Sequence, residues 1–422
     1  MSRLMRVLKK LALAAGVLLM IALLANVVLV WVTGSRLEDR LAALRAAGQP
    51  VVLTDLQLSP LDADQDAATY LNRARDDQKA FAKETLAIQS KPEYGADELN
   101  EADLKTLRTA FDAYPKLVPL LEQAANCPDY RPALDYAAGP DAVLVAGTEE
   151  AQRFRAAVNV LDARARLLTA EGKSEEALSA AVTMFRLAKH LEREPMMIGN
   201  LLLIACRAVA GDAAHRAVRL GPVSAKLRDS LDVELAAADD SRAYVFSLRS
   251  ERALGTEFFR AMSGNVWFTR AYVNDNQSYL IDVLNRMVEL ADRPNSEVQA
   301  FQRQWQQQSG SLRHALSKLV LSAVFSPRLA WDRSAARLRC LRVINALQRR
   351  GGEPALADLG LPAAATTDPF TGEPLHVKKT AEGWLVYAVG EDLKDDGGQV
   401  TRPESGGNPK DIGFGPIVAK AK

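Results

Sequence analysis

An apolar run near the N-terminus restricts this chain more than any other feature of its 422 residues. The run spans residues 11–32, and Asn26 is its only clearly polar side chain. Roughly 20 apolar residues in an α-helix, at about 1.5 Å per residue, cross a bilayer core of about 30 Å. The sequence therefore predicts a transmembrane helix, and we assign residues 1–34 as a membrane anchor.

The charges that flank the run predict its orientation. Four cations precede it, namely Arg3, Arg6, Lys9 and Lys10. Because such residues favour the cytoplasmic side, we expect a single-pass protein of the cytoplasmic membrane with its N-terminus inside. Everything beyond Gly34 is then extracytoplasmic, and Trp31 suits the aromatic position at the bilayer interface.

A cleaved signal peptide is the alternative interpretation of these residues. Its apolar region would cover roughly 7–15 residues and end in small residues such as Ala-x-Ala. The run here is longer and ends in Leu-Val-Trp-Val-Thr, which favours an uncleaved signal-anchor.

The overall charge excludes one class of partner. The formal net charge is +1, so no overall field attracts nucleic acid, and we expect no nucleic-acid partner. A local basic cluster is expected to be a solvated helix face, and it comprises Arg337, Arg339, Arg342, Arg349 and Arg350.

Beyond the anchor, apolar periodicity predicts a mainly α chain in three further parts. They are a juxtamembrane helical region at 35–140, a helical domain at 141–330 and a small C-terminal α+β module at 331–422. Glycine and proline separate the expected helices. Outside residues 149–220, these helices cover 35–47, 67–89, 100–125, 223–263, 276–292, 297–321 and 331–350.

Residues 149–220 show the clearest helical pattern and predict three consecutive antiparallel helices. Gly172 ends the first, Ser174 is expected to cap the second, and Pro195 opens the third. The side chains expected to face the core are Leu161, Leu168, Phe185, Leu191 and Leu202.

Part of this region resembles one tetratricopeptide hairpin. The likeness covers residues 163–191 and is carried by Ala165, Leu167, Leu168 and the segment 172–178. Because no second copy follows at a fixed spacing, we expect an irregular antiparallel stack rather than a regular array.

Signals of catalysis are lacking in the sequence. It contains no nucleotide-binding glycine motif, phosphate loop, zinc-protease motif or nucleophile elbow. The four histidines are dispersed, and we expect His190 and His215 at surface or half-buried positions. No catalytic residue is nominated, although an enzyme site assembled from distant residues stays an alternative.

Two further groups of residues have a structural and a functional interpretation. The three cysteines form neither a disulfide framework nor a zinc motif, and Cys206 and Cys340 are expected to be buried as small hydrophobic residues. An aromatic group either lines a groove for a ligand or partner or fills a core. It comprises Phe258, Phe259, Trp267, Phe268, Tyr272 and Tyr279.

Near the C-terminus the pattern changes from helix to strand. Residues 374–379 and 384–389 are the expected strands, joined by a turn at Ala381-Glu382-Gly383. Because two strands alone are marginal in water, we expect them to pack on helix 331–350. An acidic, glycine-rich stretch follows them.

This C-terminal order resembles the globular part of the major pseudopilins of type II secretion. The likeness covers residues 335–414. The matching residues are Asp368, Pro369, Phe370, Gly372, Pro374, Leu385, Tyr387, Val389, Gly390, Asp392, Asp411 and Ile412. In that family the acidic loop holds a calcium ion, so the resemblance implies calcium as a cofactor here.

The resemblance also implies the calcium ligands. The side chains of Asp392 and Asp411 would bind the ion, together with the carbonyl oxygens of Val389 and Lys394. Asp395 and Asp396 are further carboxylates of the same loop that could serve instead. Such a mixture of carboxylate and carbonyl oxygens is what calcium prefers.

Other features depart from the pseudopilin pattern. The family carries a peptidase cleavage site and a glutamate in its N-terminal helix, and neither occurs in residues 1–32. Leu393 stands where the family has glycine. As a whole, the chain is similar to large uncharacterised membrane-anchored proteins of planctomycete-type bacteria, and that similarity implies no activity.

Taken together, these observations predict a membrane-anchored extracytoplasmic scaffold or binding protein. Its protein partner is expected to bind through the helical domain. The alternatives are an accessory component of a secretion or pilus-like assembly, and an enzyme.

Overall fold

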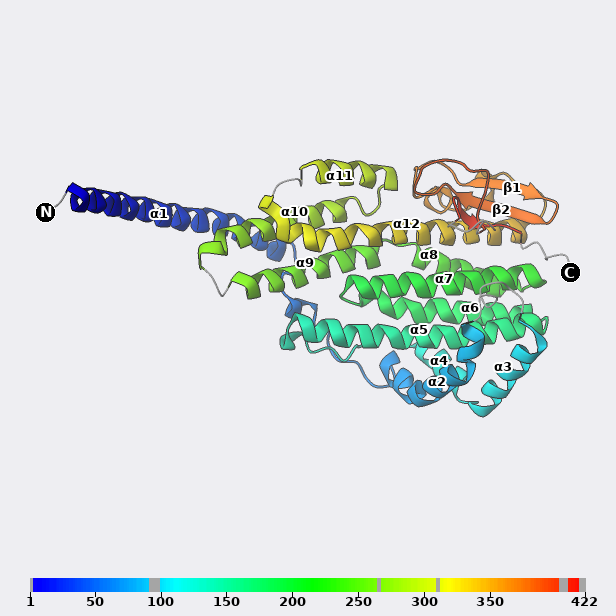
Figure 1. Cartoon of the computed structure of the whole chain (residues 1–422). Helices are drawn as coiled ribbons and strands as arrows, with labels where there is room; N and C mark the ends of the chain where they lie inside the picture. Colours follow the sequence, from blue (N-terminus) through cyan, green and yellow to red (C-terminus); the bar gives the residue numbers. More distant parts are fainter. Residues whose placement is uncertain (1–2, 91–98, 264–266, 309–311, 402–408, 417–422) are drawn as a thin grey trace.

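A long helix that leaves one end of the body dominates the shape of the molecule (Figure 1). The computed structural model describes residues 3–90, 99–263, 267–308, 312–401 and 409–416. Within these ranges the chain is mainly helical, with one small antiparallel sheet near the C-terminus, as the sequence predicts.

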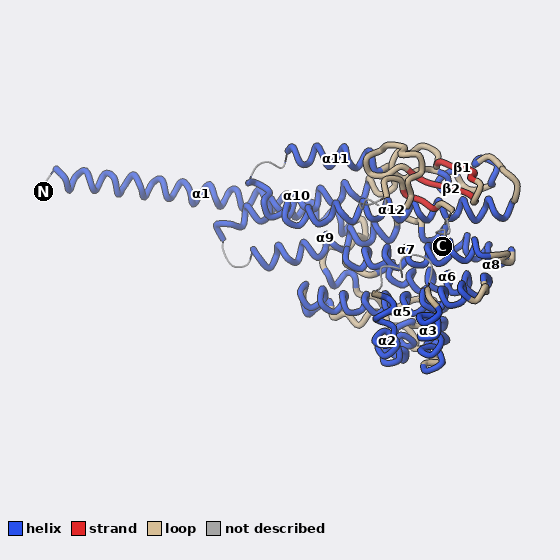
Figure 2. Tube along the Cα trace, turned by 45° about the vertical axis from the view of Figure 1, so that its right-hand side comes forward, coloured by secondary structure: helices blue, strands red, loops and turns tan. Residues whose placement is uncertain are grey.

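The body is a stack of helices with the sheet on its last helix. In Figures 1 and 2 the layers run from α2–α4, through α5–α7, to α8, α9, α10 and α12. The helices are α1 (Arg3–Ala46), α2 (Ala67–Gln89), α3 (Glu101–Ala113), α4 (Leu117–Asn126), α5 (Pro140–Ala170), α6 (Ser174–Lys189), α7 (Met197–Leu220), α8 (Ala225–Ala238), α9 (Arg242–Ser263), α10 (Arg270–Glu289), α11 (Asn295–Gln308) and α12 (Ala315–Arg350). The strands are β1 (His376–Thr380), β2 (Gly383–Ala388) and β3 (Ile412–Phe414).

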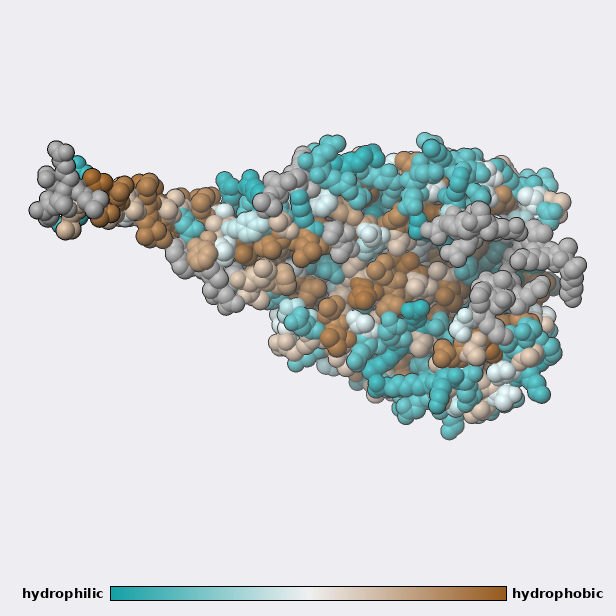
Figure 3. Space-filling view, viewed as in Figure 1, coloured by the Kyte–Doolittle hydropathy of each residue, from teal (hydrophilic) through white to brown (hydrophobic). Residues whose placement is uncertain are grey.

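Helix α1 passes without a break from an exposed apolar stretch into the body. Trp31 is 73% exposed, and Figure 3 shows this stretch as a hydrophobic stalk. Toward the C-terminal end of α1, Leu41 and Leu44 are buried against Ile281 of α10. The composition of α7 would also suit a membrane span, but 61% of its apolar window is buried in the core. Helix α1 is therefore compatible with the predicted single-pass anchor.

The three helices predicted within residues 149–220 are α5, α6 and α7, and each packs against the other two. All the side chains predicted to face their core are buried: Leu161, Leu168, Phe185, Leu191 and Leu202. The predicted cap at Ser174 is wrong, because its hydroxyl instead donates to the carbonyl oxygen of Pro222 (3.2 Å). The tetratricopeptide likeness stays a prediction.

Two predicted helices are each divided in the structure. Pro115 separates α3 from α4 within the helix expected at 100–125, because proline removes a backbone donor. The helix expected at 223–263 is divided into α8 and α9. Between them the carboxylate of Asp240 accepts from the backbone N–H of Arg242 (2.9 Å), which favours a new helix start over continuation.

For helix α12 the prediction fails in the opposite way, because parts of two expected helices are one helix in the structure. It begins at Ala315, within the helix expected at 297–321, and continues through Pro327 to the end of the helix expected at 331–350. Pro327 lacks the backbone N–H that would bond within the helix. The buried side chains of Phe325 and Arg328, on either side of Pro327 in the sequence, offset this loss by their packing and hydrogen bonds. The expected boundaries between parts at 34 and 330 thus fall inside α1 and α12.

The sheet has the order β1-β2-β3, and all pairs are antiparallel. Strands β1 and β2 confirm the predicted hairpin, while β3 was not predicted. Its Gly413 lies so close to β2 that an added Cβ would stand 2.1 Å from the carbonyl oxygen of Val386. As predicted, the sheet packs on α12, since Ala388 and Phe414 are buried in the same core as Leu341.

The basic cluster on α12 is only partly the solvated face that the sequence predicts, because Arg349 and Arg350 are exposed whereas Arg337, Arg339 and Arg342 are half-buried. Four of its arginines face acidic residues of α7, of α8 and just after α8, and the structure pairs them as Arg337–Asp212, Arg339–Asp239 (2.8 Å), Arg342–Asp232 (2.7 Å) and Arg349–Asp229 (2.5 Å). Arg350 instead donates to the carbonyl oxygen of Asp358. Single partly exposed pairs contribute little stability, but a row of them favours one alignment of α8 on α12.

The buried face of α5 and α6 generates a direct test of the core. Leu161→Ala or Phe185→Ala should each lower the free energy of unfolding by about 2–5 kcal/mol, because each leaves a cavity among packed side chains. Val233→Ala on α8, where the valine is 64% exposed, is the control and should change it by less than about 0.5 kcal/mol. Equal small effects at all three positions, measured by urea unfolding, would contradict this packing.

Candidate functional site

The acidic loop expected to bind calcium folds around Asp411, which is fully buried. The carboxylate of Asp411 accepts backbone N–H groups from Gly398 (2.8 Å), Gln399 (2.9 Å) and Asp396 (3.3 Å). These donors already occupy both carboxylate oxygens and point positive charge toward them. The loop is therefore closed by hydrogen bonds of its own backbone.

Asp392 lies beside this segment in a separate turn. Its carboxylate is exposed and accepts the backbone N–H of Lys394 (3.2 Å). Leu393, the next residue of this turn, adopts φ 60°. The tight turn is thus kept at a cost of roughly 1–2 kcal/mol for a left-handed residue with a side chain.

Val389, whose carbonyl oxygen is an expected ligand, directly follows β2. The backbone N–H of Val389 donates to Asp368 (2.8 Å), a buried carboxylate that also accepts from Phe370 (2.7 Å) and so joins the Asp-Pro turn to the end of β2. Lys394 is exposed. Among the described residues, no group of three or more His, Cys, Asp or Glu side chains is arranged to hold a metal ion. The oxygen atoms of the side chains in this loop therefore fit a calcium site poorly, and calcium binding stays a prediction.

A larger candidate site is an open cleft of about 800 Å³ on the helical body, which we call the charged cleft. It lies where the end of α4, the end of α6, the 3₁₀ helix η4 (His190–Arg193), α8 and the start of α9 meet. Its charged lining comprises the cations Arg186, Lys189, Arg193, Arg242 and Arg249 and the anions Asp129, Glu192 and Glu234.

Each anion of the charged cleft has an arginine beside it. Arg186 pairs with Glu234 (2.8 Å), Arg193 with Asp129 (3.3 Å), and Arg207, from behind the cleft, with Glu192 (2.5 Å). The arginines beside Asp129, Arg131 foremost, hold the pKa of that carboxyl below its usual range although burial opposes them. The acidic side of the lining is therefore neutralised.

Two cations of the charged cleft are left for a ligand. Within the described ranges of the chain, neither Lys189 nor Arg249 has an ion-pair partner. The Nε of Arg249 is buried and finds no hydrogen-bond partner among the described atoms. The lining is consequently suited to an anionic group, and Phe246 and Val245 add an apolar wall.

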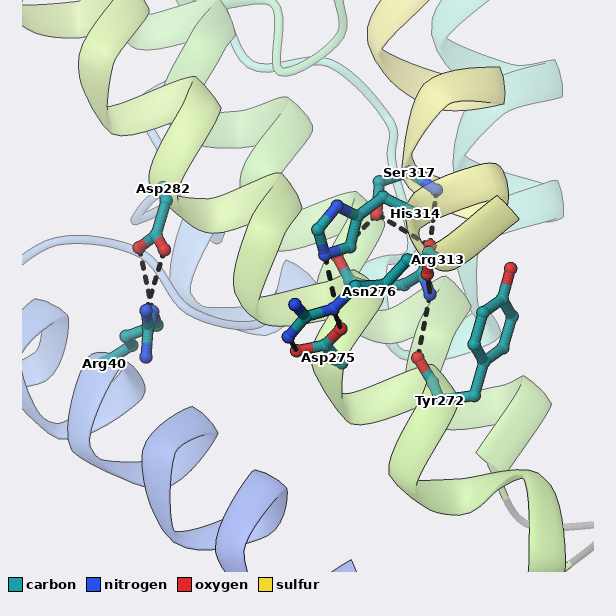
Figure 4. A network of polar contacts seen from close by, with 8 residues as sticks. All are labelled: Arg40, Tyr272, Asp275, Asn276, Asp282, Arg313, His314 and Ser317. Carbon is teal, nitrogen blue, oxygen red and sulfur yellow. Dashed lines mark hydrogen bonds and ion pairs between the residues drawn. The ribbon is translucent and has the colours of Figure 1, made fainter. Parts of the chain in front are cut away.

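A second polar cluster lies where α1 enters the body, and Figure 4 shows it from close by. The guanidinium of Arg40 on α1 binds both carboxylate oxygens of Asp282 on α10 (2.8 and 2.7 Å). Two turns earlier on α10, Asp275 accepts from Arg313 (2.8 Å) and lies 3.2 Å from the ring of His314. The hydrogen bond from Arg313 holds the pKa of Asp275 below its usual range.

Asn276 connects the same helix to α12. Its buried amide donates to the carbonyl oxygens of Tyr272 and Arg313 (both 2.9 Å), and it accepts the backbone N–H of Ser317 (3.1 Å). The Ser317 hydroxyl donates back to the carbonyl oxygen of Asn276 (2.6 Å). This cluster is a structural joint between α1, α10 and α12 rather than a reactive site, because its polar groups satisfy one another.

The two histidines expected at surface or half-buried positions are in fact buried. The Nε2–H of His190 donates to the carbonyl oxygen of Ala124 (3.0 Å), and burial lowers the pKa of its ring. His215 packs on Phe414 with 4.6 Å between ring centres, and burial lowers its pKa to about 3. Cys206 and Cys340 are buried as predicted.

A buried carboxyl that the sequence did not indicate is Glu194, which is 3% exposed. Burial, and next the charge of Glu150, raise its pKa to about 8. Its surroundings are closely packed, since a Cβ added at Gly199 would stand 2.0 Å from its Cγ. Glu194 does not line the charged cleft and is a buried acid of the core. Its position in Glu-Arg-Glu-Pro resembles a solvated loop, which is why the sequence gave no signal.

Comparison with known proteins adds no relative. Neither a known protein family, nor a curated protein, nor a solved structure matches the chain. The likeness of the C-terminal residues to pseudopilins stays a prediction.

The raised pKa of Glu194 generates a pH-dependent prediction. The folded protein retains this proton between about pH 4, near the unfolded pKa, and pH 8, so its stability falls as pH rises through that window. Glu194→Gln removes the effect. In urea unfolding it should be more stable than the parent at pH 8 by a few kcal/mol, at about 1.4 kcal/mol per pKa unit, with little difference at pH 4.

Glu149→Gln, an exposed carboxyl of α5, is the control and should show no such change between the two pH values. A Glu194→Gln difference that is the same at both pH values would show that folding does not raise the pKa of this carboxyl.

Proposed function

We propose that this chain is a membrane-anchored, extracytoplasmic binding protein whose charged cleft takes an acidic segment of a protein partner. The observation that carries the proposal is the lining of the cleft, in which every anion is paired and Lys189 and Arg249 are left for a ligand.

The anchor part of the proposal is supported by α1. Its apolar residues are exposed along the stretch that length and composition would place in a bilayer, and its other end is buried in the body. The cations at the N-terminus support the orientation with the body outside. Exposed leucines and valines in such numbers are costly in water, and a bilayer removes that cost.

The choice of an acidic protein segment follows from the shape and chemistry of the cleft. It is open and lined by several elements of the helical body, so it admits an extended or helical chain rather than enclosing a small molecule. Arginine and lysine attract carboxylates at long range and hold them by charge-assisted hydrogen bonds. The apolar wall at Val245 and Phe246 would contact the stems of acidic side chains.

Co-flotation with liposomes tests both parts with the full chain. The protein is reconstituted in phosphatidylcholine vesicles, washed with alkaline carbonate and floated in a density gradient with a fluorescent oligoglutamate peptide. We expect the protein to float after the wash and the peptide to float with it, with loss of peptide as salt screens the charges. Lys189→Glu combined with Arg249→Glu should abolish peptide flotation and leave protein flotation unchanged.

The matched control is Arg75→Glu combined with Lys105→Glu, which reverses two exposed cations of α2 and α3 outside the cleft. It should retain the peptide. A protein that stays in the dense fraction contradicts the anchor, and a peptide that both double variants bind equally contradicts the cleft.

A further inference from the structure

The aromatic group indicated by the sequence is divided in the structure. Phe259 is fully buried, and Tyr279 stacks on His314 with 3.9 Å between ring centres. By contrast, Phe268 is 63% exposed and Tyr272 is 37% exposed. The side chain of Trp267 lies outside the described residues. The exposed aromatic side chains therefore form an apolar surface where α9 ends and α10 begins.

This surface lies beside the base of the apolar stalk. Helix α10 runs alongside α1 in the same direction, with Asn274 bonded to Thr33 (3.4 Å) and Asp282 to Arg40 (2.7 Å). Because both are α-helices with the same rise per residue, Tyr272 lies about level with Trp31. Phe268 lies in the short 3₁₀ helix (Trp267–Thr269) that leads directly into α10, about one turn before Tyr272, which places it level with the apolar stretch itself.

Helix α9 brings a further apolar residue to the same level. It packs antiparallel to α10, with Arg252 bonded to Asn285 and Gly255 facing Leu280. Following that pairing toward the end of α9 places Met262, which is 37% exposed, near the level of Asn274. Figures 1 and 3 show this end of the body beside the base of α1, with hydrophobic side chains on it.

We propose that Met262, Phe268 and Tyr272 form a second membrane contact, which enters the headgroup region of the same phospholipid bilayer that holds α1. We call these three residues the membrane-facing tip. The inference rests on the anchor of the proposed function, because α1 fixes where the bilayer surface lies.

The physical argument is the level of these residues in the bilayer. Tyrosine and other aromatic side chains favour the bilayer interface, where an apolar ring meets lipid and a polar atom meets water. Arg270, exposed between Phe268 and Tyr272, would lie among lipid phosphate groups. Apolar rings that would be exposed in water are instead buried in lipid, which is favourable because apolar surface is removed from water.

The membrane-facing tip would restrict how the body is oriented on the membrane. A single helix lets a body rotate and tilt on the membrane, whereas a second contact beside it holds one side of the body against the lipid. The membrane-facing tip would thus fix which way the charged cleft faces.

Quenching by lipid tests this inference in the full chain. Cys127→Ser removes the partly exposed native cysteine, and the other two are buried. An environment-sensitive fluorophore is then attached at Phe268→Cys, at Trp31→Cys, or at Leu86→Cys on α2, where the leucine is 63% exposed away from the stalk. The protein is placed in phosphatidylcholine vesicles that contain lipids with a nitroxide near the headgroup.

We expect loss of emission at positions 31 and 268 and none at 86. Quenching at 31 without quenching at 268 overturns the membrane-facing tip and leaves the anchor intact, whereas no quenching at 31 means that the proposed anchor itself fails. Equal quenching at 268 and 86 means that the body adsorbs to lipid without specificity. Emission at 268 that is shielded from water but not quenched by lipid means that protein covers this surface, which also overturns the proposal.

Discussion

The second half of α1 packs against α10, and this contact joins the apolar stalk to everything else. Leu41 and Leu44 are buried against Ile281, while Arg40 binds Asp282 with two hydrogen bonds. A helix continues across a change of solvent because its backbone groups bond within the helix itself. The first half of α1 can therefore face lipid and the second half protein, with no hinge between them.

Buried polar groups extend this contact between α1 and α10 to helix α9. Arg252 is almost fully buried and binds Gln49, just after α1, as well as Asn285 on α10. Burial, and next the nearby Arg249, lower its pKa to about 10, so the guanidinium stays charged at neutral pH and keeps these hydrogen bonds. Arg249 itself lines the charged cleft. The cleft is thus built on the same helix that is fixed to the base of the stalk.

Local patterns were enough to predict those parts of the fold that depend on neighbouring residues. The period of apolar residues identified the buried faces of α5 and α6, because one face of a helix is set by its own sequence. The continuation of α12 through Pro327 and the pairing of β3 could not be predicted from local patterns, since packing by distant elements determines both. The cleft is the extreme case: Lys189 and Arg249 come from separate segments, and only the fold shows which acids are already paired.

Rigidity of the joint between α1 and the body is the central claim, and a distance distribution measures it directly. Spin labels at Val28→Cys on the stalk and Leu86→Cys on α2, in the Cys127→Ser background, are studied by double electron–electron resonance in vesicles. The structure predicts one narrow distance that broadens when Arg40→Ala and Leu41→Ala are combined. A broad distribution in the parent chain, unchanged by that pair of substitutions, would contradict the account.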